Sequence, residues 1–597
     1  MKKSKISIPL MLLGLSLCSC SSDPSFPSLS SASSSLGQDA SSEVHSSEEF
    51  SSSSGSIASS EEEIELEEVK KSNVYLGTLS NPLSLHTYFF SCFQDVPYVE
   101  ASSFYTSFWN AVYQLDVYEE KDGLLVNSLN GATCKFLPEE NKIFFSDYDL
   151  FSSASSLPIP YDVLSVSEDK SAEFDLSCCS YSSGGAFCFD LAPYGAKIID
   201  FEGDILVPFA YLECIAFAPF GNRFAFNGDD YYYVEDSALY SGAQLTPYGR
   251  AYHSGSLATN RYRSFDYSEY FYYSFLFEME NFYGKFDSLR IEDLDVRLEE
   301  AGLKSELLSE NGSVADSAVA SAISTLFGDG GHTGFLHRGA GVSYSARIDS
   351  ELQMELLNSD YRYSQKARRH SELYRKRGGL VPYQCYGGTA VIRFDSFEVS
   401  PFSLSPDKET VSSDSYSTFA LFYNSFQRIK DNPSVERVVF DVSLNGGGYA
   451  VALGQALSFL SEDPIKLRVH NPLTGSDFVE AVRYDNDFDG EYDGDSYQGK
   501  YDFYILTSAY SFSCGNAFPC MAQEAGLAKI IGERSGGGDC SVTQGVASDG
   551  AHWRMSSNQR LVHADGSSFD SGARVDIALA DDCFYDVEKL DAALSNA

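Results

Sequence analysis

The sequence has few basic residues, no pair of CxxC motifs and, after its first twenty residues, no long apolar run. Only 42 Lys and Arg residues stand against 85 Asp and Glu residues, so the formal net charge is −43. Nucleic acid is therefore not an expected partner, because phosphate binding needs clustered cations. A structural zinc site has no support without paired CxxC motifs, and no later stretch is apolar for the roughly 20 residues that a spanning helix needs. We expect neither a metal nor a cofactor.

The N-terminus has the organisation of an export signal. Three lysines occur within the first five residues, an apolar run follows over residues 6–17, and the run ends at Leu17-Cys18-Ser19-Cys20. This ending resembles a bacterial lipoprotein signal in which Cys20 carries the lipid. Leu15-Ser16-Leu17-Cys18 is a competing register, and an ordinary secretory signal or an uncleaved anchor are the alternatives. We expect a protein held by lipid at the extracytoplasmic face of a bacterial cell membrane.

Composition divides the rest of the chain into four parts. Serine accounts for 20 of the 40 residues from 21 to 60, a composition that cannot build a core. We therefore predict a disordered Ser/Glu-rich stalk over 21–72. Residues 73–255 alternate aromatic and β-branched residues with polar ones, which predicts a β-rich N-terminal region. Residues 256–386 follow a helical period, and residues 387–597 show an α/β pattern.

The α/β pattern consists of apolar runs that alternate with amphipathic segments. Strands are predicted at 389–394, 438–442, 504–508 and 529–533, and helices at 418–429 and 449–460. This order implies parallel strands joined by crossover helices. Ligands of such sheets bind beyond the carboxyl ends of the strands. Both Ser513 and the loop Asn445-Gly446-Gly447-Gly448 fall at such ends.

Ser513 lies where a strand and a tight turn lead into a helix. A hydroxyl at this place lies beside backbone N–H groups that no helical turn has used, which is the setting that a nucleophilic serine needs for its oxyanion. The N–H groups of Gly446, Gly447 and Cys514 are the predicted oxyanion donors. Ser at a helix N-cap is the structural alternative for Ser513, and phosphate binding is the alternative for the glycine loop, although GxxxxGK[ST] is absent.

Four blocks of the sequence resemble those of C-terminal processing (tail-specific) serine peptidases. Phe440–Gly448 is similar to their DLRxNxGG block, Ser511–Asn516 to SASAS-E, and Ile530–Glu533 to the IIGE strand. Asp329-Gly330-Gly331-His332-Thr333 resembles the DGHT block of the tricorn and retinoid-binding-module branch. The resemblance covers residues 265–597. It implies an α/β fold with a crotonase/ClpP-like peptidase core, preceded by the helical segment and a separate N-terminal region, and it implies a polypeptide substrate.

The chain also departs from this family. The Ser-Lys branch has a lysine in the turn after the IIGE strand, and residues 535–539 contain none. The Arg of the first block and its neighbour are replaced by Ser443 and Leu444, and Asn516 stands where the family has Glu. No PDZ-sized insert separates the His-containing loop from the core. These departures leave a catalytically impaired binding or adhesion lipoprotein as the alternative to a surface-anchored serine endopeptidase.

Without that lysine, a histidine must act as the base. The resemblance implies His332, whose near-neutral pKa as a free side chain suits both proton transfers; His552 and His563 are rival candidates. The orienting acid implied by the family order is Asp570, with Asp576 in reserve. Either aspartate can instead be a turn residue.

One acidic segment begins like a calcium-binding loop. Asp485, Asp487 and Asp489 occupy positions one, three and five of an EF-hand loop, and Gly490 occupies position six. Position twelve, however, is Ser496 where an EF-hand needs a bidentate Glu. We interpret the segment as a solvated acidic loop, with structural calcium as the alternative.

Overall fold

The computed structural model describes the chain from residue 64 to residue 596. Within this span it leaves out residues 110–115, 121–122, 129, 154–160, 162, 165–171, 242–243, 260–261, 341–359, 379–380, 401–406 and 493–495. The predicted signal, Cys20 and most of the predicted stalk therefore lie outside the described residues. Within the described part, no helix has both the length and the apolarity that crossing a bilayer requires.

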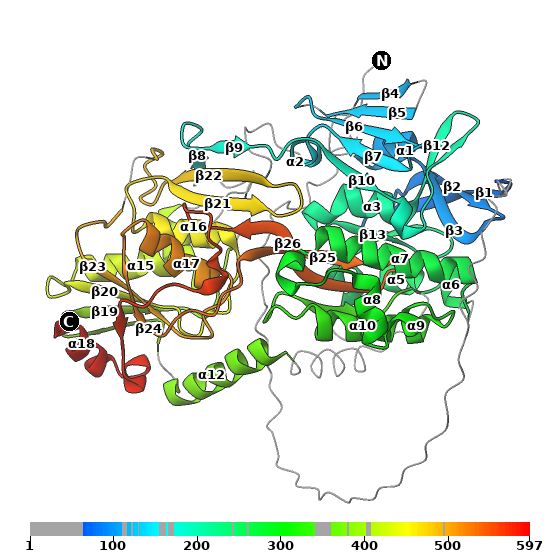
Figure 1. Ribbon diagram of the computed structural model, residues 1–597. Coiled ribbons are helices and arrows are strands. Elements are labelled where there is room, and N and C mark those ends of the chain that lie inside the picture. Colours follow the sequence, from blue (N-terminus) through cyan, green and yellow to red (C-terminus); the bar gives the residue numbers. More distant parts are fainter. Residues whose placement is uncertain are drawn as a thin grey trace, which may run out of the picture.

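A six-stranded sheet forms the centre of the C-terminal lobe, on the left of Figure 1. Its strands, in spatial order, are β18 (Tyr383–Tyr386), β19 (Thr389–Arg393), β20 (Arg437–Asp441), β23 (Asp502–Thr507), β24 (Lys529–Gly532) and β27 (Ile577–Ala578). All pairings from β19 to β27 are parallel, and β18 alone in this sheet pairs antiparallel. The predicted parallel arrangement is confirmed.

Helices cover both faces of this sheet because its central strands are apolar on both sides. In β20, Val438 and Phe440 pack against the helices on one face of the sheet. Val439 packs into a separate cluster on the other face. The first face holds α15 (Thr418–Lys430), α16 (Ala450–Ser458) and α17 (Cys514–Glu524). The second holds α18 (Val587–Ser595) and Leu373 of α12 (Tyr361–Arg377).

A second sheet joins parts of the chain that the sequence had assigned to three regions. Its strands are β8 (Ala172–Phe174), β9 (Ser180–Ser182), β17 (Gly334–His337), β21 (Ile465–Asn471), β22 (Ser476–Tyr484), β25 (Cys540–Val546) and β26 (His552–Leu561). Strands β8 and β9 from the N-terminal region pair with β22 of the core, and β17 of the helical segment pairs with β26. The predicted boundaries at 255 and 386 thus do not separate the sheets.

Two further sheets lie in the N-terminal part, the first mixed and the second antiparallel. The first is ordered β11 (Ile199–Phe201), β12 (Asp204–Pro208), β3 (Phe93–Glu100), β2 (Leu83–Phe90), β1 (Leu66–Tyr75), β14 (Tyr231–Val234), β13 (Arg223–Phe226). The second is ordered β10 (Phe187–Asp190), β7 (Lys142–Phe145), β6 (Thr133–Leu137), β5 (Gly123–Asn127), β4 (Asp116–Glu120). Strand β1 begins inside the predicted stalk, whose boundary had been placed at 72. Its inner end alternates buried Ser72 and Val74 with more exposed residues, so the acidic run leads into a strand.

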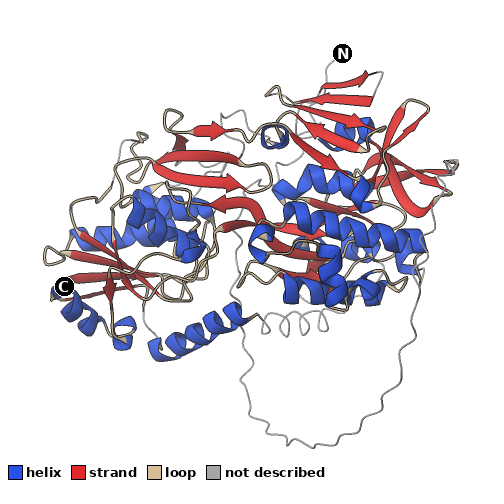
Figure 2. Cartoon of the chain, in the orientation of Figure 1, coloured by secondary structure: helices blue, strands red, loops and turns tan. Residues whose placement is uncertain are grey.

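The right-hand lobe contains most of the remaining helices, beside the long strands β25 and β26 that run between the lobes (Figures 1 and 2). The main helices here are α3 (Phe209–Phe217), α7 (Phe265–Phe282), α8 (Leu294–Glu300), α9 (Lys304–Leu307) and α10 (Gly312–Leu326). Shorter helices are α1 (Ala101–Phe104), α2 (Tyr148–Ser152), α4 (Asp236–Leu239), α5 (Pro247–Tyr252), α6 (Ser256–Thr259) and, in the other lobe, α14 (Lys408–Ser413). The loop that carries His332 connects α10 to β17, so this lobe brings the histidine toward the core.

Candidate active site

Ser513 occupies a strained turn between β23 and α17. Its backbone has φ 56° and ψ −125°, a conformation that non-glycine residues rarely adopt and that costs on the order of 1–3 kcal/mol. The turn is held by the Ser513 N–H, which donates to Gly537 O at 3.0 Å, and by the Phe512 N–H, which donates to Asn445 O at 3.1 Å. Such strain persists only where the surrounding structure imposes it, and it is typical of a nucleophile at a strand-to-helix elbow.

The hydroxyl of Ser513 does not cap the helix. Ser513 is the N-cap residue of α17, yet its side chain accepts no capping hydrogen bond. The Oγ atom is buried and has no hydrogen-bond partner among the described residues, and the residue is 1% exposed. Buried hydroxyls are normally paired, so this geometry favours a chemical function for Ser513 over the capping interpretation.

The glycine loop passes directly beside Ser513. A Cβ atom at Gly447, which has φ +124°, would lie 2.7 Å from Ser513 Cβ and 3.1 Å from its Oγ. The Gly446 N–H donates to Asp395 O at 3.2 Å and the Gly447 N–H to Asn445 Oδ1 at 2.9 Å. Both of these predicted oxyanion donors thus already have acceptors, one after β19 and one within the glycine loop. Within the described residues, no acceptor is present for the N–H of Gly448 or of Cys514, the third predicted donor.

Gly447→Ala is expected to lower kcat/KM by at least 100-fold. The added methyl group would meet the nucleophile at less than contact distance and would strain a left-handed backbone. Steady-state hydrolysis of a labelled polypeptide measures the effect. Gly475→Ala is the control, since Gly475 also has positive φ but meets no atom within 4 Å. Equal losses in both variants would contradict a specific role for the loop.

His332 is held by a loop that wraps around one carboxylate. Asp329 Oδ1 accepts the backbone N–H groups of Gly331, His332 and Thr333, at 3.2, 2.9 and 2.9 Å. Asp329 Oδ2 accepts the Thr333 hydroxyl at 2.8 Å and the Ser556 hydroxyl at 2.6 Å. The side chain of His332 is 2% exposed, and its Nε2 has no partner among the described residues. The loop thus presents a buried, unpaired imidazole nitrogen.

The rings of His332 and Phe512 join the two loops. Their centroids are 4.7 Å apart, and Phe512 directly precedes Ser513. The structure therefore brings the predicted base to the nucleophile's turn, some 180 residues away in sequence. Within the described part of the chain, neither His332 Nε2 nor Ser513 Oγ has a hydrogen-bond partner, so the two atoms are not bonded to each other here. Catalytic hydrogen bonds are often long before substrate binds.

Burial lowers the pKa of His332 to about 4. The neighbouring carboxylates of Asp329 and Asp539 oppose this effect, whereas Arg554 and Lys366 add to it. The imidazole is therefore neutral at neutral pH, which is the form that a general base needs.

Comparison with known proteins identifies the part of the chain that contains Ser513. Residues 388–579 match the model of peptidase family S41. This stretch is a serine peptidase domain. It includes the glycine loop and the α17 elbow, and it excludes the His332 loop. No curated protein matches the chain.

Several solved structures are similar to part of the chain. Mature CPAF complexed with lactacystin is 12% identical over 55% of this chain and 99% of that chain, with a TM-score of 0.36. A lipoprotein from Streptococcus agalactiae is 14% identical over 55% and 96%, with a TM-score of 0.33. The photosystem II D1 C-terminal processing protease is 18% identical over 35% and 48%, with a TM-score of 0.26. All three scores are below 0.5, so these likenesses add no argument to the family match.

Asp570 lies in the peptidase domain, next to the turn that holds Ser513. Its carboxylate accepts the Gly538 N–H at 3.0 Å and pairs with Lys285 at 3.2 Å and Arg362 at 3.2 Å. Although burial acts in the opposite direction, these two cations hold the pKa of Asp570 well below its usual range. Asp570 has no contact with the His332 ring among the described residues, so its function as the orienting acid stays a prediction.

The reserve candidates lie elsewhere. Asp576 accepts the Ile530 N–H at 2.8 Å, at the amino end of β24 and thus away from the carboxyl edge. His563 lies 3.3 Å from Glu524, and its ring lies close to that of Phe569 in a tilted arrangement. His552 is buried in β26, with its ring 5.1 Å from that of His337. Of the three histidines considered, His332 alone contacts a residue of the nucleophile's turn.

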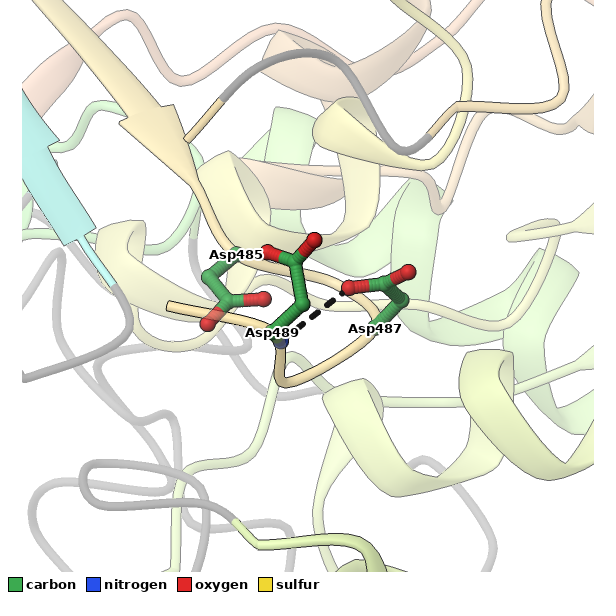
Figure 3. Close-up of side chains that lie close together, drawn as sticks. All are labelled: Asp485, Asp487 and Asp489. Carbon is green, nitrogen blue, oxygen red and sulfur yellow. Dashed lines mark hydrogen bonds between the residues drawn. The ribbon is translucent and has the colours of Figure 1, made fainter. Parts of the chain in front are cut away.

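In the acidic segment after β22, carboxylates accept hydrogen bonds from the segment's own backbone. Figure 3 shows Asp485, Asp487 and Asp489, whose carboxylate oxygens lie within 4.8 Å of one another. Asp485 accepts the N–H groups of Phe488 and Gly490 at 2.7 and 3.0 Å. Hydrogen bonds within the loop account for the clustering, so the solvated-loop interpretation stands beside the calcium alternative.

Proposed function

We propose that the protein is a serine endopeptidase that cleaves polypeptides and that lipid at Cys20 anchors it to the extracytoplasmic face of a bacterial membrane. A crotonase/ClpP-like core would carry the chemistry, and the β-rich N-terminal region would lie between the core and the stalk. The observation that carries the proposal is the unpaired Ser513 hydroxyl in a left-handed elbow within the family S41 domain.

The reaction would follow the order used by Ser-His hydrolases. Ser513 Oγ attacks the peptide carbonyl while His332 Nε2 takes the hydroxyl proton. The C–N bond then breaks, and the imidazolium gives that proton to the leaving amine. Water, deprotonated by the same imidazole, attacks the acyl-enzyme, and Ser513 recovers its proton as the carboxylate product leaves.

The oxyanion would be bound by backbone N–H groups. Cys514 N–H follows the nucleophile directly, and Gly448 N–H comes from the glycine loop; neither has an acceptor among the described residues. Preorganised donors of this kind contribute about 10²–10³ each to kcat. The hydrogen bonds from Gly446 to Asp395 O and from Gly447 to Asn445 Oδ1 hold the glycine loop in place, so these two residues would shape the oxyanion site.

A fluorophosphonate probe tests this proposal. Labelling of the wild-type protein that is lost in both Ser513→Ala and His332→Ala supports the Ser-His peptidase. Labelling lost only in Ser513→Ala would keep the nucleophile and reject His332 as the base.

One observation favours a second function, a binding or adhesion lipoprotein with an impaired site. Ser513 and His332 are both buried and are not bonded to each other, so substrate has no direct access to them in this conformation. A folded wild-type protein that neither reacts with the probe nor hydrolyses polypeptides would favour this alternative.

The pH dependence of the peptidase follows from the buried imidazole. Because the pKa of His332 is lowered to about 4, the base stays neutral and kcat/KM is expected to hold from about pH 6 down to about pH 5. It should fall as the pH drops through about 4, when His332 becomes protonated. Hydrolysis rates in buffers of constant ionic strength measure this acidic limb of the pH profile. A limb near 6.5 would show that the imidazole is solvated in the active enzyme.

A further inference from the structure

Helix α12 is basic in a strongly acidic protein. Residues 361–377 contain seven of the 42 Lys and Arg residues and only one acidic residue, Glu372. Its sequence belongs to none of the motifs discussed above, and it lies outside the matched peptidase domain. The acidic partners of this helix show where it lies against the rest of the molecule.

The partners of α12 lie at the carboxyl edge of the core sheet. Arg377 pairs with Asp441 at 2.7 Å, at the end of β20. Arg369 pairs with Glu533, directly after β24, and Arg362 pairs with Asp570. In Figure 1, α12 lies beneath the core in the drawn view. The helix therefore crosses the edge at which the Ser513 turn and the glycine loop are found.

Lys366 reaches the space between the two catalytic loops. Its Nζ donates to Gly330 O at 3.0 Å, two residues before His332. The same Nζ lies 3.7 Å from the ring centroid of Phe512, the residue before Ser513. The side chain is buried, so both contacts are made without water between them and are stronger than at the surface.

The helix makes a second contact with the same loop. Asp360, the N-cap residue of α12, accepts the Gly330 N–H at 2.8 Å. One peptide unit on each side of Gly330 is thus held by α12, through a carboxylate and an ammonium group. These contacts fix the position of the histidine loop relative to the helix.

We propose that Lys366 is a positioning residue that clamps the His332 loop against the Ser513 turn and so sets the approach of imidazole to hydroxyl. The proposal rests on the proposed peptidase function. Lys366 contacts Gly330 and Phe512, not the reacting atoms, so its contribution is to geometry. The sequence-based exclusion of a Ser-Lys mechanism is unaffected, because this lysine comes from a different element and bonds to a carbonyl.

Charged groups surround the clamp on several sides. Lys366 faces Arg362 and Asp360 from α12 and its N-cap, Asp329 from the histidine loop and Asp570 from the core. Burial, aided by Arg362, lowers the pKa of Lys366 to about 7. Above this pH the ammonium loses its proton and its attraction to the Phe512 ring. The clamp is therefore tightest below neutral pH.

Two substitutions of Lys366 and one control test the clamp. Lys366→Met keeps the stem but removes the charge and the donor, and it should lower kcat at least tenfold with KM within about twofold. Lys366→Arg keeps a permanent cation and should restore most of kcat. Lys376→Met is the matched control on the same helix, where the lysine pairs with Asp581 and Glu372; its kcat should equal that of the wild type.

The pH profile separates positioning from folding. Wild-type kcat should decline several-fold as the pH rises through about 7, and this limb should disappear in Lys366→Met and move above pH 9 in Lys366→Arg. If Lys366→Met folds poorly, the position of the basic limb in the pH profile of Lys366→Arg is sufficient to test the proposal. An active enzyme whose kcat and basic limb are the same in all four proteins overturns the proposal.

A measurement without turnover separates this proposal from the peptidase function. In a Ser513→Ala background, labelled histidine resonances report the His332 ring, which faces Asp329, Asp539, Arg554 and Lys366. Lys366→Met should shift this resonance and raise the pKa of His332, because a nearby cation is removed; Lys376→Met should change neither. The same shift, found together with a wild-type protein that hydrolyses no polypeptide, would support the clamp and reject the function. An unmoved His332 resonance would reject the clamp.

Discussion

Alanine in place of Ser513 is expected to lower kcat by about 10⁴-fold or more, because the hydroxyl that forms the acyl-enzyme is lost. Hydrolysis of fluorescein-labelled casein by equal amounts of folded protein measures the effect. Ser571→Ala is the matched control, since Ser571 is an exposed serine that follows Asp570. Residual activity of Ser513→Ala above a tenth of the wild type would contradict a nucleophilic role.

Glycine at the same position provides a second readout. The backbone of Ser513 lies at φ 56°, where glycine has no Cβ penalty. Ser513→Gly should therefore be as inactive as Ser513→Ala but more stable, by about 1 kcal/mol. An increase in the midpoint of unfolding for Ser513→Gly over Ser513→Ala would show that the fold maintains strain at the nucleophile.

The sequence was sufficient for the parallel core because local signals and tertiary structure agree there. The strand predicted at 438–442 is β20, and the helix predicted at 418–429 is α15. Each is apolar with the period that its burial requires. The second sheet, which joins β8, β9 and β17 to strands of the core, could not be predicted. These three strands are only three or four residues long, and they pair with strands hundreds of residues away. Short strands carry too little periodicity to specify a partner.

Of the site residues, the sequence predicted only those that lie in recognisable motifs. The blocks around Ser513 and His332 named the two residues that Phe512 joins in space. The hydrogen-bond partners of individual backbone N–H groups could not be predicted. Whether the N–H of Gly447 points to a substrate or to Asn445 Oδ1 depends on loop torsions that residue identity does not fix. Lys366 belongs to no motif. Its signal was the excess of basic residues on one helix of an acidic chain, which predicts acidic partners without saying which loops carry them.

Arg223→Met is expected to destabilise the protein by about 3–5 kcal/mol, because it leaves two buried carboxylates without their cation. Arg223 is fully buried in β13; it pairs with Glu213 of α3 at 2.8 Å and with Glu278 of α7. It also donates to Gln544 O of β25 at 2.8 Å. This cluster therefore connects the N-terminal strands to β25 of the second sheet.

The loss should grow with pH. Burial raises the pKa of Glu278 to about 7 even though Arg223 opposes this effect. A carboxyl group with a raised folded-state pKa contributes stability below its unfolded-state pKa and loses it as the pH rises through the folded value. Without Arg223 that value rises further, so Arg223→Met should lose more at pH 8 than at pH 5.

Thermal unfolding at the two pH values measures both effects. Arg297→Met is the control, because Arg297 is a half-exposed arginine whose partner Glu300 is one helical turn away, and such surface pairs contribute well under 1 kcal/mol. Equal midpoints for Arg223→Met and the control, or a difference that does not widen between pH 5 and pH 8, would show that the junction does not depend on Arg223. A widening difference would identify Arg223 as the charge on which the junction of the N-terminal strands with β25 depends.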